Sequence, residues 1–119
     1  MAKLDPKALG KQAGSMLKDS LLKVWGETEE ARADLEIRVE RYEKALSGTV
    51  DALQQATSED AARRLRDDLE RFLPSWKAGL VSEVASRSGS AAQAAAEAAL
   101  DVAVKVGLLV ARSFFPIPG

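Results

Sequence analysis

Apolar residues recur at helical spacing from the first residues of this chain onward. Asp5-Pro6 supplies an N-cap followed by proline at the first helical position, and the periodic segment reaches Trp25. We predict that this first helix ends near Gly26. Its expected apolar side comprises Leu9, Ala13, Met16, Leu17, Ser20 and Val24.

A second helix is predicted after Thr28, whose side chain can cap it. Its apolar residues follow steps of four and three for about three heptads, which is the a/d seam of a coiled coil. Ile37 points almost opposite to this seam. The seam comprises Leu35, Val39, Tyr42, Leu46, Thr49/Val50 and Leu53.

Two further helices are predicted in the second half of the chain. Thr57-Ser58-Glu59-Asp60 reads as a capping box for the third, and Pro74 is expected to kink it or to start a new turn. Ser86-Arg87-Ser88-Gly89 is expected to separate a fourth helix. That helix is Ala-rich at first and then rich in Val and Leu. Because more than half of its circumference is apolar, we expect neighbouring helices to enclose it.

These segments predict an all-α protein with one helical domain over residues 1–119. The expected architecture is a small antiparallel bundle of about four helices with coiled-coil-like packing. No alternating apolar/polar run and no Asn-Gly or Asp-Gly hairpin signal supports strands. Residues 114–119 form an apolar C-terminal tail in which two prolines prevent a helix.

Composition argues against catalysis. The chain has no His and no Cys, so it lacks the usual proton-transfer side chain and the usual zinc ligands. Adjacent carboxylates such as Asp67-Asp68 point about 100° apart on a helix rather than toward each other. Phosphate-binding glycine motifs and a nucleophile elbow are missing from the sequence. We therefore predict no catalytic, cofactor-binding or metal-binding residues and no cofactor.

The distribution of charged residues along the chain indicates one candidate electrostatic contact surface. Lys3, Lys7, Lys11 and Lys18 line one side of the first helix, whereas residues 27–44 carry an excess of acidic side chains. The two stretches can complement each other or a neighbouring copy, and a membrane surface or a nucleic acid is the alternative contact. The net charge of −1 makes nucleic acid the weaker alternative. No signal peptide and no spanning helix is evident, so we expect the protein in the cytoplasm or within an assembled particle.

The apolar surface gives the leading functional hypothesis. Four short helices barely enclose the last one, and self-association would cover the excess. We expect a structural or adaptor protein that packs its helices against a second copy or into a larger complex, such as a virion. The tail can dock in cis or in trans. The predicted partner-binding residues are Ile37, Val106, Leu109, Val110, Phe114, Phe115 and Ile117.

Two alternatives use the same surface. The first is a peripheral membrane or hydrophobic-surface binding protein, since in composition the chain loosely resembles phasin-type granule coat proteins, which are also Ala-rich and form coiled coils. That resemblance is one of composition and carries no shared motif. The second alternative is a small regulator or inhibitor that occludes a partner protein.

Overall fold

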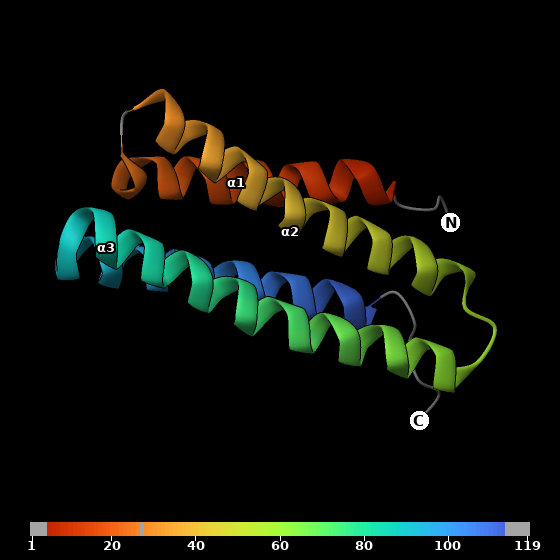
Figure 1. Cartoon of the computed structure of the whole chain (residues 1–119). Coiled ribbons are helices and arrows are strands. Elements are labelled where there is room, and N and C mark those ends of the chain that lie inside the picture. Colours follow the sequence, from red (N-terminus) through yellow and green to blue (C-terminus); the bar gives the residue numbers. More distant parts are fainter. Residues whose placement is uncertain (1–4, 27, 114–119) are drawn as a thin grey trace.

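A computed structural model describes residues 5–26 and 28–113 of the chain. These residues form three α-helices and no strand: α1 (Pro6–Trp25), α2 (Glu29–Gln55) and α3 (Glu59–Ser113) (Figure 1). The predicted all-α class is confirmed. The start and end of α1 and the start of α2 also agree with the expected positions.

The predicted count of four helices is not matched, since α3 runs through residues 86–89 as one element. The expected break is nevertheless present as a kink at Gly89 that separates two helical parts. Within α3 only Gly89 departs from helical geometry, with φ 86° and ψ −176°. Glycine has no Cβ and adopts this positive φ without strain. The chain therefore turns at one residue with no loop, and Figure 1 shows the part after Gly89 returning beside the part before it. The ion pair between Lys77 and Asp101 and the Arg112–Glu70 pair at 3.3 Å join these two parts.

Side-chain caps fix where the helices begin. The Asp5 carboxylate accepts a hydrogen bond from the Lys7 N–H at 3.0 Å, and the Thr28 hydroxyl accepts one from the Ala31 N–H at 3.1 Å. Both caps were predicted. At the start of α3 the acceptor is Ser58 rather than Thr57, at 3.2 Å from the Ala61 nitrogen. Pro74 lies inside α3 and is exposed, so it neither starts nor ends a helix.

The apolar seam of α2 is the centre of the core. The predicted seam is confirmed, since every one of its large apolar side chains is buried. Tyr42 stacks on Trp76 of α3 with ring centroids 5.0 Å apart, and its hydroxyl donates a hydrogen bond to the Ala103 carbonyl at 2.9 Å. Trp76 in turn donates through Nε1 to the Arg38 carbonyl at 3.0 Å. Two aromatic side chains thus link α2 to both parts of α3.

The buried face of α1 is shifted around the helix from the face that the sequence predicted. Met16, expected in the core, is 67% exposed, and the buried row comprises Gly10, Gly14, Leu17, Leu21 and Trp25. Glycine at the first two positions lets α1 approach α2 closely. A Cβ on Gly10 would lie 2.8 Å from the Glu43 carbonyl oxygen, and a Cβ on Gly14 would overlap the Glu43 side chain. Close backbone approach therefore decides which face of α1 is buried.

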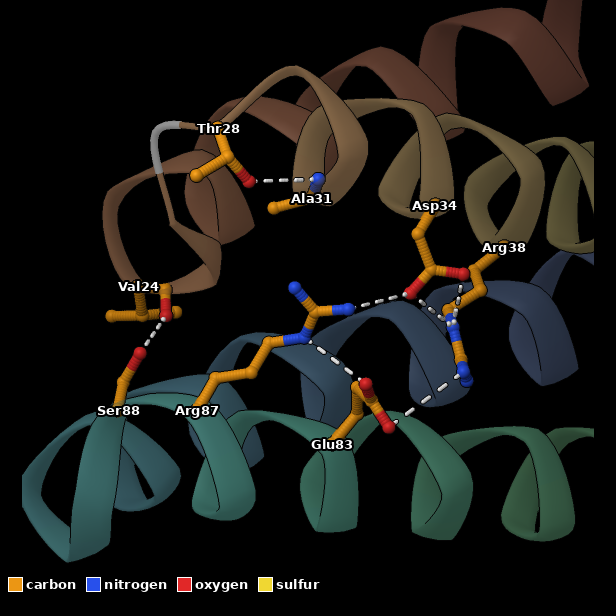
Figure 2. A network of polar contacts seen from close by, with 8 residues as sticks. All are labelled: Val24, Thr28, Ala31, Asp34, Arg38, Glu83, Arg87 and Ser88. Atoms are coloured by element: carbon orange, nitrogen blue, oxygen red, sulfur yellow. Dashed lines mark hydrogen bonds and ion pairs between the residues drawn. The ribbon is translucent and has the colours of Figure 1, made fainter.

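A polar cluster ties the α1–α2 connection to the turn of α3 (Figure 2). Arg87 contacts Asp34 at 3.4 Å and Glu83 at 3.0 Å, and Arg38 contacts the same two carboxylates at 3.3 and 3.9 Å. The guanidiniums of Arg38 and Arg87 lie over the buried Trp25 ring, 5.7 and 5.6 Å from its centroid respectively. Figure 2 also shows the Ser88 hydroxyl bonded to the Val24 carbonyl, at 2.9 Å. These contacts hold all three helices together at one end.

Two glycine-to-alanine substitutions test the close approach of α1 to α2. Gly10→Ala should lower the free energy of unfolding, because the new methyl group meets a backbone atom that cannot rotate away. Gly48→Ala is the matched control, since nothing lies within 4 Å of the added Cβ. It should raise the free energy of unfolding by up to about 1 kcal/mol through helix propensity. Urea denaturation followed by circular dichroism measures both, and a stabilised Gly10→Ala would contradict the packing.

Candidate functional site

The part of α3 after Gly89 turns its small side chains inward. The interior is already occupied by larger groups: a Cβ on Gly107 would lie 3.2 Å from Leu73 Cδ1, 3.8 Å from the Tyr42 hydroxyl and 3.9 Å from Leu46 Cδ1. Side chains of Val or Leu size do not fit at this position. The buried residues here are Ala96, Leu100, Ala103, Gly107 and Ala111.

Three bulky apolar side chains of the same segment point outward, whereas Leu100 is buried and Val104, Leu108 and Val110 are half-buried against the core. Val102 is 61% exposed, Val106 is 39% exposed and Leu109 is 67% exposed. Met16 of α1 lies beside two of them, since it shares a groove with Val102 and Val106. We call Met16, Val102, Val106 and Leu109 the apolar strip. It holds four of the five exposed large hydrophobic side chains of the described residues.

A groove of about 180 Å³ separates α1 from α3 along this strip. No charged side chain lines it among the described residues, so it is suited to apolar groups. Its lining residues are Ala13, Met16, Leu17, Ser20, Tyr42, Ala99, Val102, Ala103 and Val106. The surface can accept an apolar helix or chain segment, and its two hydroxyl groups, those of Ser20 and Tyr42, donate hydrogen bonds to the Met16 and Ala103 carbonyls.

The predicted partner-binding residues separate into four groups. Val106 and Leu109 belong to the apolar strip. Val110 is half-buried and packs against the core. Ile37 is 53% exposed on α2 and takes no part in the strip. The tail residues Phe114, Phe115 and Ile117 lie outside the described residues, as does Lys3.

Sequence reasoning missed Met16 and Val102 as surface residues. Met16 was assigned to the core because it shares helical spacing with Leu9 and Ala13. A second seam was present in the sequence and would have found Val102. Its members, Ala95, Ala99, Val102, Val106 and Leu109, follow steps of four and three.

The lysines of α1 lie against acidic residues of α2. Lys7, Lys11 and Lys18 line a polar groove of about 450 Å³, which three glutamates of α2 also line. Lys18 pairs with Glu36 at 2.8 Å. These lysines thus face opposite charges within the molecule, which is one of the contacts expected from the sequence.

Two carboxylates in this groove differ in their environment. The hydrogen bond from Lys18, together with its charge, holds the pKa of Glu36 below the ordinary value. Burial raises the pKa of Glu43, and the nearby Glu40 adds to this effect while Lys11 and Lys18 oppose it. Glu43 is the side chain that covers Gly14, so the close approach of α1 and α2 explains its burial.

No group of three or more carboxylates in the described part of the chain is placed to hold a metal ion. Nor does any described helix combine the length and apolar character that crossing a bilayer requires. Comparison with protein-family models, curated proteins and solved structures found no match to this chain. The candidate site therefore has to be interpreted from its own geometry.

The Tyr42 phenol, which lines the apolar groove, gives a pH test of this packing. Burial raises its pKa from 10.0 to about 12. The folded state therefore keeps the proton at pH values where the unfolded state loses it. The contribution of the protonated Tyr42 phenol to the free energy of unfolding is complete below pH 10.0, and it is lost as the pH rises through about 12. We expect the free energy of unfolding to fall more steeply over this range for the wild type than for Tyr42→Phe.

Below this range, Tyr42→Phe should be less stable by about 1 kcal/mol, because the bond to the Ala103 carbonyl is lost. Urea denaturation at a series of pH values measures both effects. Lysine deprotonation contributes to both proteins, so the difference between them isolates Tyr42. Parallel pH dependence of the two proteins would show that the phenol is not buried as described.

Proposed function

We propose that this chain is a non-enzymatic structural or adaptor protein that associates with a second copy of itself through the apolar strip. The observation that carries the proposal is the orientation of α3 after Gly89. Ala103, Gly107 and Ala111 are buried, whereas Val102, Val106 and Leu109 are exposed, on the side where Met16 lies. A helix that exposes its larger apolar side chains has a face suited to another molecule.

Burying the apolar strip against a partner would lower the free energy of the complex. Fully burying a side chain of Val, Leu or Met size contributes about 1.5–3 kcal/mol. The four strip residues are already partly covered, so their contact with a partner would add somewhat less for each. Several kcal/mol is nevertheless the scale at which specific association begins. No charged side chain would have to be desolvated in the groove lining that the structure describes.

The sizes of the seam residues suit an antiparallel pair of α3 segments. Val102 lies two helical turns from Ala95 and two turns from Leu109. With a two-fold axis at Val102, Leu109 would meet the small Ala95 of the partner subunit, and Val106 would lie near Ala99 of the partner subunit. Large and small side chains would then alternate across the contact, as in close-packed interiors.

The proposal includes the finer architecture expected from the sequence, an antiparallel bundle with coiled-coil-like packing. In its support, α1 and α2 run in opposite directions, and α3 doubles back at Gly89 (Figure 1). The heptad spacing of the α2 seam is of the coiled-coil kind. A second copy would extend this packing beyond a single chain.

Charged substitutions in the strip test the proposal. The wild type should form a dimer or a larger defined oligomer in size-exclusion chromatography with light scattering. Val102→Glu combined with Leu109→Glu should shift it to a monomer, because two carboxylates would be buried without partners. The folded monomer should keep its helical signal in circular dichroism, since both positions are exposed. Ala33→Glu, at an exposed position of α2, is the control and should leave the oligomer intact.

A wild type that stays monomeric at the highest concentration tested would contradict self-association. An oligomer that survives the double substitution would place the contact elsewhere. Sedimentation with liposomes separates the membrane alternative: a monomeric wild type that binds vesicles and loses binding in the double variant would favour a hydrophobic-surface protein.

A further inference from the structure

A second groove, of about 470 Å³, lies between α2 and the first part of α3. It shares no lining residue with the groove along the apolar strip. Arg38 and Arg41 line it from α2, and Arg71, Phe72 and Trp76 line it from α3. No acidic residue lines it in the part of the chain that the structure describes. We call it the arginine groove.

The arginines of this groove differ in whether they are already paired. Arg38 is held by Asp34 at 3.3 Å and by Glu83 at 3.9 Å. Arg41 and Arg71 are exposed and form no ion pair with another described residue. Two unpaired guanidiniums therefore line one groove from two different helices. Guanidinium groups bind carboxylates through two parallel hydrogen bonds, so the groove complements an acidic ligand.

Apart from Ser75, the rest of the groove is apolar, and hydrogen bonding and stacking hold its Trp76 side chain in place. Trp76 stacks between Tyr42 and Phe72, with ring centroids 5.0 and 6.5 Å away, and its Nε1 bonds to the Arg38 carbonyl. Gly79 adds no side chain to the groove, and a Cβ there would come no closer than 3.9 Å to Arg38. An aromatic floor of this kind can pack against an apolar side chain of a ligand.

Ile37 is an exposed apolar residue of α2 outside the lining of the arginine groove. It precedes Arg41 by one helical turn on α2, so the two side chains lie on the same side of the helix. It is 53% exposed and belongs neither to the core nor to the apolar strip. A ligand that carries both acidic and apolar groups would use Ile37 and Arg41 together.

We propose that the arginine groove binds a segment of a partner protein in which carboxylate side chains alternate with apolar ones. The carboxylates would pair with Arg41 and Arg71, and the apolar side chains would contact Phe72, Trp76 and Ile37. Nucleic acid fits less well, because the groove offers only two unpaired arginines and a polyanion is bound through several phosphate contacts. The net charge of −1 also provides no attraction for one.

Selection from a random peptide library displayed on phage tests this proposal on the full chain. The wild type is compared with Arg41→Glu combined with Arg71→Glu. Arg32→Glu combined with Arg63→Glu is the control, since it makes the same charge change at exposed positions outside the groove. The wild type and the control should both enrich peptides that combine Asp or Glu with apolar residues. The groove variant should not.

Fluorescence anisotropy then measures the affinity of one enriched, labelled peptide. It should bind the groove variant at least tenfold more weakly than the wild type and should bind the wild type more weakly as salt is added. Arg41→Gln with Arg71→Gln repeats the test if the charge-reversed variant fails to fold. Enrichment of peptides without acidic residues, or equal affinity for wild type and variant, would overturn the proposal. So would duplex DNA that displaces the peptide more effectively than unlabelled peptide does.

Discussion

The burial of one apolar seam, that of α2, is the interaction on which the rest of the structure depends. Its side chains from Leu35 to Leu53 contact α1 on one side and both parts of α3 on the other. Tyr42 and Trp76 add directional bonds to this contact, because each donates a hydrogen bond to a backbone carbonyl of another helix. The core contains no buried charged side chain among the described residues, so packing supplies its stability.

The side chains of α2 fill the centre of the core, and they constrain how the part of α3 after Gly89 packs. Large side chains already occupy the centre around Gly107, so beyond the buried Leu100 the residues of α3 that face inward are Ala103, Gly107 and Ala111. Val102, Val106 and Leu109 are then left exposed, on the side of the molecule where Met16 lies. The apolar strip is therefore a result of core packing. This is why we assign it to association rather than to incomplete folding.

The two proposed contact surfaces differ in physical character. The apolar strip offers side chains that gain by leaving water, which suits an extended helix of a second copy. The arginine groove combines two unpaired cations with a rigid aromatic floor, which suits a ligand of mixed acidic and apolar character. By contrast, the lysines of α1 face glutamates of α2, so their charges are largely complemented within the chain.

The sequence by itself determined the helical class, two helix starts and the complete seam of α2, because caps and heptad spacing act between residues close in the chain. Tertiary structure decided the rest. It placed Gly10 and Gly14 against Glu43, which rotated α1 and exposed Met16. It also decided that the break expected at residues 86–89 is a turn at Gly89 alone, with no loop. Each outcome depends on which atoms of a distant segment occupy the neighbouring space, and periodicity within a helix carries no such information.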